Sequence, residues 1–341
     1  MSSESINQED DITVADLGEF GLIAAIRAVL PPDPPGVLGV GPSVQGVGDD
    51  AAVLPAPDGR VVASTDLLIE GRHFRREWSV AADIGVKAAA QNLADIAAMG
   101  AAPTALLFGL AVPGEIAVAW VVGVAEGLVA ECTRAGAVIA GGDVTSSDSV
   151  MLAITALGGL AGRDPVTRGG ARPGDVVAIS GPVGMSAAGL SLLRAGLAAP
   201  EPELEHLVAA HRRPHPDYAA GPLAAAAGAT AMIDVSDGLV ADLGHIAGAS
   251  GVLIDIRSHS LPGIRALEPA AGRLGTDWLG WALAGGEDHA LAATFPGESM
   301  VPHGWTVIGS VRHGAGLLVD SKPWNREPGW DHFRGSTTFP V

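Results

Sequence analysis

Aspartates recur at the ends of the apolar, strand-like segments of this chain. Together with one aspartate in the segment NLADIAAMG, they are Asp49, Asp50, Asp66, Asp95, Asp143, Asp234 and Asp237. A carboxylate at the end of a strand is held by a rigid scaffold, and several carboxylates directed at one place repel one another. Cations between them would remove this repulsion, and hard oxygen ligands suit Mg²⁺. The pattern therefore indicates a magnesium-dependent enzyme that handles phosphate.

Two short segments that contain these aspartates are unequal as evidence for a metal site. Ser64, Thr65 and Asp66 offer three oxygen ligands at the expected end of a strand, but such residues more often cap a helix or a turn. Asp49 and Asp50 place two adjacent carboxylates just before a buried strand. That arrangement is costly without a cation, so the pair is the better indication of metal.

Glycines accompany the acids at positions suited to phosphate. Gly142 precedes Asp143 in AVIAGGD and leaves the backbone free of side chains beside a ligand. The glycine-rich segment 36–48 has the same potential, although such segments more often only turn the chain. Asp234 and Asp237 lie three residues apart before a helix expected from residue 238, whose N–H groups favour anions.

A helix is expected over residues 81–99. Lys87, Gln91 and Asp95 recur on one face, and Asn92 adjoins it. The alternative is a solvated helix face, but the surrounding alanines favour a buried one. The chain lacks the motif GxxxxGK[ST] and has only two lysines, Lys87 and Lys322. If it binds ATP, metal ions and arginines must neutralise the phosphates.

Four further residues are candidates for substrate recognition. Glu287 lies in GGED before an expected strand, and Arg168 in VTRGG could clamp phosphate through its forked guanidinium. Other arginines nearby compete for that role. His73 could bind phosphate or merely fill a loop, and Trp330 could contact substrate or merely anchor packing.

Composition limits the classes of partner. Of the 341 residues, 48% are hydrophobic and 4% aromatic, which favours close packing with apolar surface left for a subunit interface. A net charge of −18 argues against nucleic acid and anionic membranes as partners. The apolar runs stop short of a membrane span, and the acidic N-terminus is unlike a secretory signal. One cysteine, Cys132, excludes an internal disulfide. We therefore expect a cytosolic protein.

The order of expected strands and helices predicts two domains after a disordered tail. The tail covers residues 1–18, an N-terminal α/β sandwich covers 19–162, and a C-terminal domain covers 163–341. A Gly-, Pro- and Arg-rich segment, GRDPVTRGGARPGD, connects the domains.

Taken together, the motifs resemble the thiamine-monophosphate kinase family over residues 18–333. The segments that carry the resemblance are GDDAAVL, STDLLIEGRHF, KAAAQNLADIAAMGAAP, GGDVT, TRGGARPGD, IDVSDGLVADLGHIA and GGEDHAL. The resemblance implies the two-domain fold of the aminoimidazole ribonucleotide synthetase superfamily. In that fold an N-terminal α/β domain dimerises and a C-terminal α+β domain covers the active-site cleft.

The resemblance also implies roles for individual residues. The implied magnesium shell is Asp50, Ser64, Thr65, Asp66, Asp95, Asp143, Asp234 and Asp237. The residues implied to face ATP are Gly142, Asp143, Arg168 and Ser236. Those implied to face thiamine monophosphate are His73, Glu287 and Trp330. The chain departs from the family in its long acidic tail and in His289, which stands where a tyrosine is common; neither is expected to touch a ligand.

The implied reaction transfers a phosphoryl group from ATP to thiamine monophosphate, which gives thiamine diphosphate. Of the acids, Asp50, Asp66, Asp143 and Asp237 are expected to be catalytic through Mg²⁺. The acceptor phosphate is ionised at neutral pH, so no strong base is needed, and the protein is expected to be a homodimer. The alternatives are a related cyclo-ligase such as aminoimidazole ribonucleotide synthetase, or a non-catalytic nucleotide-binding dimer.

Overall fold

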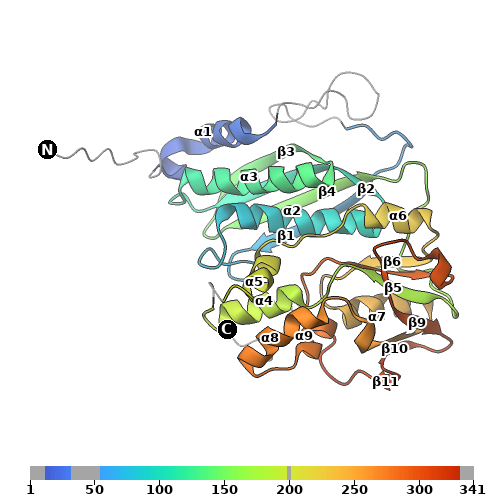
Figure 1. Ribbon diagram of the computed structural model, residues 1–341. Helices are drawn as coiled ribbons and strands as arrows, with labels where there is room; N and C mark the ends of the chain where they lie inside the picture. Colours follow the sequence, from blue (N-terminus) through green and yellow to red (C-terminus); the bar gives the residue numbers. More distant parts are fainter. Residues whose placement is uncertain (1–11, 32–53, 198–200, 331–341) are drawn as a thin grey trace. The chain divides into compact units, whose positions relative to one another are not determined.

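The computed structural model describes residues 12–31, 54–197 and 201–330, and these residues divide between two compact units (Figure 1). Unit 1 comprises the described residues up to 59 together with 63–92 and 103–157. Unit 2 comprises 60–62, 93–102 and the described residues from 158 onward. The pair Asp49 and Asp50 and the segment 36–48 lie outside the described residues.

Unit 1 is built on a four-stranded sheet with the strand order β1-β4-β2-β3, in which β2 and β3 are parallel. Its elements are α1 (Val14–Val29), β1 (Val62–Ile69), α2 (Ala81–Ala98), β2 (Ala102–Val112), α3 (Val118–Ala135), β3 (Val138–Ser146) and β4 (Met151–Gly159). The helix expected over residues 81–99 is present as α2. The last residues of α2 belong to unit 2.

Helix α1 corrects the expected disordered tail. Residues 14–18 of that tail lie in α1, and Thr13 caps the helix. The Thr13 hydroxyl accepts a hydrogen bond from the Asp16 N–H, and the Asp16 carboxylate accepts one from the Thr13 N–H. This reciprocal pair satisfies two N–H groups that the first turn leaves open, and it outweighs the polar composition of the segment.

The chain continues as strand beyond two of the acids, which corrects a second expectation. Strand β1 runs past Asp66 to Ile69, and β3 runs past Asp143 to Ser146. Both acids therefore lie within strands rather than at strand ends. Apolar residues follow each acid, and Leu68 and Val144 are buried. Because alternate side chains of a strand face opposite sides, Leu68 shares the more buried face of β1 with Asp66, whereas Val144 faces the opposite side of β3 from Asp143.

Helices α2 and α3 pack closely because glycines line their contact. A methyl group built on Gly85 would lie 2.0 Å from the Val124 carbonyl oxygen, and one on Gly127 would lie 2.1 Å from that of Ala82. The expected burial of the α2 face is confirmed, since Lys87 and Asn92 are only 2% and 0% exposed. The alanine-rich helix thus forms core rather than a solvated face.

Unit 2 carries a seven-stranded mixed sheet with the strand order β11-β10-β7-β9-β5-β8-β6. Its strands are β5 (Val176–Ser180), β6 (Ala231–Asp234), β7 (Leu253–Ile256), β8 (Leu291–Phe295), β9 (Thr306–Arg312), β10 (Gly316–Val319) and β11 (Lys322–Pro323). Its α-helices are α4 (Met185–Arg194), α5 (Glu205–Arg212), α6 (Ala220–Ala226), α7 (Leu239–Ser250), α8 (Ile264–Leu274) and α9 (Trp278–Ala284). The two units have the expected fold class, α/β followed by α+β.

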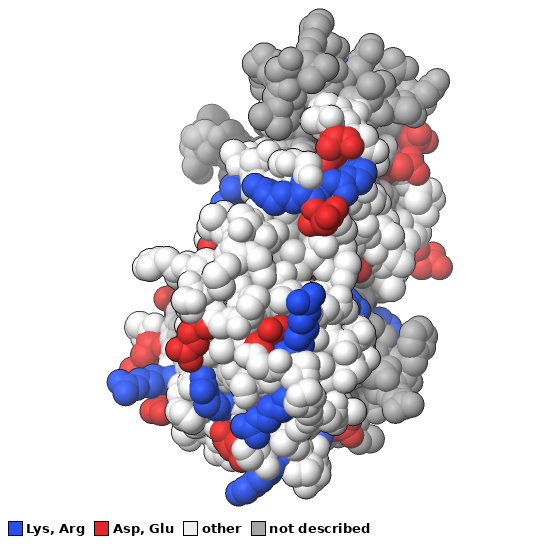
Figure 2. All heavy atoms as spheres, turned by 90° about the vertical axis from the view of Figure 1, so that its right-hand side faces the viewer, with Lys and Arg blue, Asp and Glu red and all other residues white. Residues whose placement is uncertain are grey.

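Two further observations concern the hydrophobicity of the helices and the distribution of charge on the surface. In the part of the chain that the structure describes, no helix is both long and apolar enough to cross a membrane. On the face drawn in Figure 2, basic and acidic side chains are interspersed among many uncharged residues.

Candidate active site

Strand pairing in unit 2 brings together two loops that the sequence separates by some fifty residues. Strand β6 is antiparallel to β8, with Asp234 opposite Leu291. The C-terminal end of β6 therefore lies beside the N-terminal end of β8, and the loop that follows β6 is next to the loop that precedes β8. Backbone hydrogen bonds join them, because Glu287 and His289 donate to the carbonyls of Ser236 and Val235 at 2.7 and 2.9 Å.

Glycine makes this close approach possible. A methyl group on Gly286 would lie 2.3 Å from the Ser236 carbonyl oxygen, and one on Gly238 would lie 2.9 Å from the backbone of Ala284. Gly238 also has a positive φ of 136°, a conformation that other residues rarely adopt. Gly238 and Gly286 are therefore required by the close approach of the segment after β6 to the segment that begins at Ala284.

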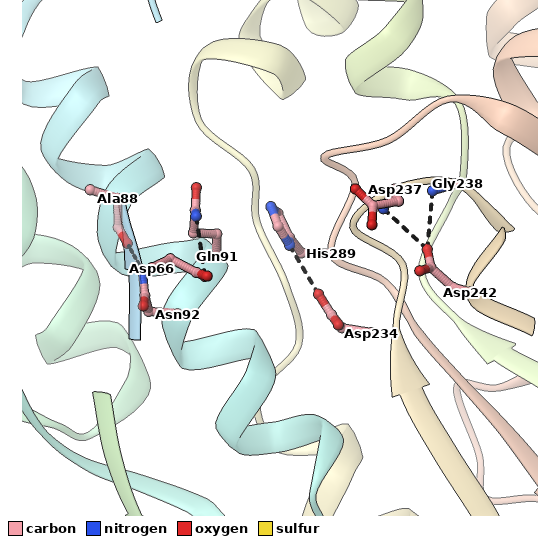
Figure 3. A network of polar contacts seen from close by, with 9 residues as sticks. All are labelled: Asp66, Ala88, Gln91, Asn92, Asp234, Asp237, Gly238, Asp242 and His289. Atoms are coloured by element: carbon pink, nitrogen blue, oxygen red, sulfur yellow. Dashed lines mark hydrogen bonds and ion pairs between the residues drawn. The ribbon is translucent and has the colours of Figure 1, made fainter. Parts of the chain in front are cut away.

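Three carboxylates gather where β6 gives way to α7. Asp234 and Asp242 are 4% and 2% exposed, and Asp237 lies between them in sequence. The Asp242 carboxylate accepts hydrogen bonds from the N–H groups of Asp237 and Gly238 at 3.2 and 3.0 Å (Figure 3). Burial, followed by the charges of Asp234 and Asp237, raises the pKa of Asp242 to about 8. At this corner, two negative charges thus add to the effect of burial on a third carboxyl group.

His289 contacts one of these acids, which corrects the expectation that it touches no ligand-binding residue. Its Nδ1 lies 3.3 Å from Oδ2 of Asp234, and both side chains are 5% exposed (Figure 3). Burial lowers the pKa of His289, but the Asp234 hydrogen bond and charge, with Glu287 and Asp95, raise it above its ordinary value. Two of the predicted metal ligands, Asp95 near the end of α2 and Asp234, thus both raise the pKa of the His289 imidazole.

The GGED loop is anchored to two helices by its acids. Asp288 accepts hydrogen bonds from the N–H groups of Gly184 and Ser186 at 2.5 and 2.9 Å and so caps the start of α4. Burial raises the pKa of Asp288 to about 7, in spite of these bonds. Glu287 lies 3.3 Å from Nδ1 of the buried His211 on α5.

The C-terminal segment meets the same corner. The Trp330 N–H donates to the Asp237 carbonyl at 2.9 Å, and a methyl group on Gly329 would lie 2.5 Å from that oxygen. Trp330 is 39% exposed, so its indole is accessible to a ligand. Arg168 is exposed, and its carbonyl accepts from the Ser250 hydroxyl at 3.2 Å. Among the described residues, no contact of its side chain ties it to the two loops.

In unit 1, the residues of STD face opposite sides of β1. Asp66 accepts a hydrogen bond from Gln91 of α2 at 3.3 Å (Figure 3), and Ser64 shares its face. Thr65 points to the other side, where its hydroxyl donates to the Ile154 carbonyl at 2.8 Å. The triplet therefore does not present three side-chain oxygens to one point. His73 accepts from the Ile69 N–H at 3.0 Å in the turn after β1.

Asp143 and Gly142 lie on the other edge of that sheet. Among the strands that the structure describes, β1 and β3 are the two outer ones of this sheet, three strand spacings or about 14 Å apart. Within one chain, Asp66 and Asp143 are therefore not brought together. A methyl group on Gly142 would lie 2.1 Å from the Phe108 carbonyl oxygen, so the register of β3 on β2 already explains this glycine. Asp143 itself is exposed.

A magnesium site is supported by donor chemistry and charge. No group of three or more His, Cys, Asp or Glu side chains in the described ranges is arranged to hold a metal ion. Asp234 and Asp237 nevertheless offer the hard oxygen donors that Mg²⁺ prefers, and their two charges add to the effect of burial in raising the pKa of Asp242. A divalent cation fits this corner. The eight-residue shell stays a prediction, and Asp50 lies outside the described residues.

Sequence reasoning missed Asp242, Asp288 and His211. An acid in the first turn of a helix is a recognised signal, because its carboxylate can reach back to the N–H groups at the start of the helix. That signal could have identified Asp242. The role of Asp288 and the position of His211 depend on which helices pack against the GGED loop, and no local pattern gives that information.

Comparison with known proteins agrees with this architecture. The family model described as "AIR synthase related protein, N-terminal domain" matches residues 48–160, and its C-terminal counterpart matches 172–292. The thiamine-monophosphate kinase of Mycobacterium tuberculosis is 47% identical over 323 residues, which are 94% of this chain and 93% of that protein. The chain belongs to the thiamine-monophosphate kinase family.

Other members of the thiamine-monophosphate kinase family agree along their whole length. The enzyme of Corynebacterium glutamicum is 44% identical over 331 residues, 95% of this chain and 96% of that protein. Among solved structures, "AaThiL complexed with AMPPCP and TMP" superimposes with a TM-score of 0.76 at 33% identity and covers 94% of this chain and 99% of the other.

Proposed function

We propose that the protein transfers the γ-phosphoryl group of ATP to thiamine monophosphate, which gives ADP and thiamine diphosphate. The observation that carries this proposal is the 47% identity to a thiamine-monophosphate kinase over 94% of the chain. A related structure in complex with AMPPCP and TMP supports the same pair of substrates.

The proposed reaction does not need a strong general base. A phosphate oxygen of thiamine monophosphate is the nucleophile, and it is already ionised at neutral pH. The bond that forms joins this oxygen to the γ-phosphorus, and the bond that breaks joins the γ-phosphorus to the oxygen bridging it to the β-phosphate. The electron pair of the broken bond leaves with ADP. We propose direct in-line transfer without a phosphoenzyme.

The main obstacle is the repulsion between two polyanions. Bound Mg²⁺ would neutralise and orient the phosphates. The residues proposed to hold several Mg²⁺ ions between them are Asp50, Ser64, Thr65, Asp66, Asp95, Asp143, Asp234 and Asp237. Asp242 would be the acid whose protonation responds to bound cations, because its pKa is raised by burial and then by the charges of Asp234 and Asp237.

The remaining residues are proposed to bind the organic parts of the substrates. Gly142, Arg168 and Ser236 would contact ATP together with Asp143. Glu287 and Trp330 would attract the cationic thiazolium ring through a carboxylate and an indole face, and His73 would contact the acceptor. Their support is uneven: Glu287 and Trp330 are both tied to the loop 234–238, whereas Arg168 is not.

We also propose a cytosolic homodimer that associates through unit 1. Apolar side chains are exposed there, since Leu67 on β1 and Phe20 on α1 are 51% and 83% exposed. Covering such side chains with a second copy would remove apolar area from water. ATP as phosphoryl donor suits a cytosolic enzyme.

The deciding experiment measures ADP release from ATP and Mg²⁺ with three acceptors: thiamine monophosphate, thiamine, and formylglycinamidine ribonucleotide. We expect release with thiamine monophosphate alone, formation of thiamine diphosphate by mass spectrometry, and loss of both with EDTA. Release with the ribonucleotide instead would establish the cyclo-ligase alternative. Nucleotide binding without release for any acceptor would establish a non-catalytic role.

A further inference from the structure

The carboxylate of Asp234 is buried but has few partners. It is 4% exposed, and in the described part of the chain its side chain makes one hydrogen bond, to His289. Two carboxylate oxygens can accept about four hydrogen bonds. A buried carboxylate is costly unless it is paired, so Oδ1 of Asp234 is available to a further positive group.

Only one of the two ring nitrogens of His289 has a hydrogen-bond partner among the described residues. Its Nδ1 contacts Asp234, whereas its buried Nε2 has no hydrogen-bond partner among the described residues. Because a carboxylate accepts hydrogen bonds, Nδ1 carries the proton in this pair. A histidine that served the core alone would be expected to satisfy both nitrogens. The polar contact of this ring is directed at Asp234.

The backbone fixes the ring in this place. The His289 N–H donates to the carbonyl of Val235, the residue next to Asp234, at 2.9 Å. His289 also adopts a positive φ of 53°, which is unfavourable for a residue with a side chain and persists where the surroundings impose it. The backbone therefore holds the imidazole beside the carboxylate.

We infer that His289 is a positioning residue, which holds the Asp234 carboxylate through Nδ1–H and leaves Oδ1 for a divalent cation. This inference rests on the proposed function, because that function places Mg²⁺ at Asp234. Groups that hydrogen-bond to a metal ligand fix its orientation, and their loss typically weakens metal binding by about 10- to 100-fold.

The test measures the Mg²⁺ dissociation constant of the full chain by calorimetry, with and without AMPPCP and in the absence of thiamine monophosphate. His289→Asn keeps an amide N–H near the place of Nδ1 and tolerates the positive φ. His289→Gln moves the N–H toward the place of Nε2, and His289→Leu removes it. His245→Leu, on the exposed side of α7, is the matched control.

We expect Mg²⁺ binding to weaken by about 10- to 100-fold in the Gln and Leu variants and to stay near wild type in the Asn and His245 variants. In an Asp234→Asn background, His289→Leu should have no further effect. Thermal unfolding identifies any variant that does not fold. Unchanged Mg²⁺ affinity in a folded Gln or Leu variant would overturn the inference, as would an equal loss in the Asn variant.

Failure of the inference and failure of the proposed function can be told apart. Mg²⁺ binding is measured without the acceptor, whereas the proposed function is tested by thiamine diphosphate formation in the wild type. A wild type that forms thiamine diphosphate, with Mg²⁺ affinity indifferent to His289, would refute the inference alone.

Discussion

Replacing Asp242 with asparagine tests the charge balance of the site without touching a proposed ligand. The pKa of Asp242 is raised from 3.8 to about 8, so the folded protein keeps this proton when the unfolded chain has lost it. Stability from this group is therefore greatest at low pH, falls as pH rises from about 4 to about 8, and is level above that. An asparagine carries no such proton, and its amide oxygen can still accept from Asp237 and Gly238.

The size of the pKa shift of Asp242 gives the expected change in unfolding free energy. Each pH unit between the two pKa values costs about 1.4 kcal/mol of unfolding free energy, so the wild type should lose about 4 kcal/mol from Asp242 between pH 4 and pH 7. Asp242 is 2% exposed, and solvent screening therefore reduces this figure little. The asparagine variant should match the wild type near pH 4 and exceed it by a few kcal/mol near pH 8.

Urea unfolding in EDTA at a series of pH values measures this difference. Tryptophan fluorescence is a suitable probe, because five of the seven tryptophans lie in unit 2: Trp278, Trp281, Trp305, Trp324 and Trp330. Asp242→Leu is the control. It leaves two N–H groups without an acceptor and should be less stable by about 1–3 kcal/mol for each. Parallel pH curves for the wild type and the asparagine variant would refute the reasoning.

Further predictions concern single positions. Asp143→Asn should lower turnover by more than about 100-fold with an unchanged circular dichroism spectrum, since Asp143 is exposed; a near-normal rate in saturating Mg²⁺ would count against its metal role. Trp330→Ala should raise the KM for thiamine monophosphate about fivefold, by loss of about 1 kcal/mol of cation–π attraction, and equal effects on the KM for ATP would remove the indole from the acceptor site. Gly127→Ala should cost about 1–3 kcal/mol in urea unfolding, because its methyl would lie 2.1 Å from the Ala82 carbonyl oxygen. In contrast, Gly272→Ala, which has open space, should stabilise α8 by up to about 1 kcal/mol.

The elements of the fold were predictable where the local pattern was long or strongly apolar. Helices α2 and α3 have 18 residues each, and the strands of unit 2 are short apolar runs bounded by glycine or proline. Helices α5, α8 and α9 were missed. They have 8, 11 and 7 residues, and α8 contains Pro269, so length and breaker residues both argued against them although tertiary packing stabilises them.

The site was predictable as a set of motifs but not as an arrangement in space. VSDG and GGED were both selected from the sequence, yet nothing local indicated that β6 pairs with β8 and joins them. For the same reason, the position of β1 and β3 at opposite edges of one sheet could not be foreseen, and Asp66 and Asp143 looked like neighbours. Strand order depends on long-range contacts, whereas motif reasoning uses only sequence order.

The GGED loop explains why residues that hold a site in place escape motif reasoning. Glu287 and His289 both have positive φ values, 64° and 53°, and each such conformation costs about 1–3 kcal/mol. The loop keeps them because His211 contacts the first side chain, Asp234 contacts the second, and Asp288 between them caps α4. Those partners come from three different elements of unit 2, α5, β6 and α4. A motif can therefore identify the acids of such a loop, but the contacts that impose its strained backbone follow only from the fold.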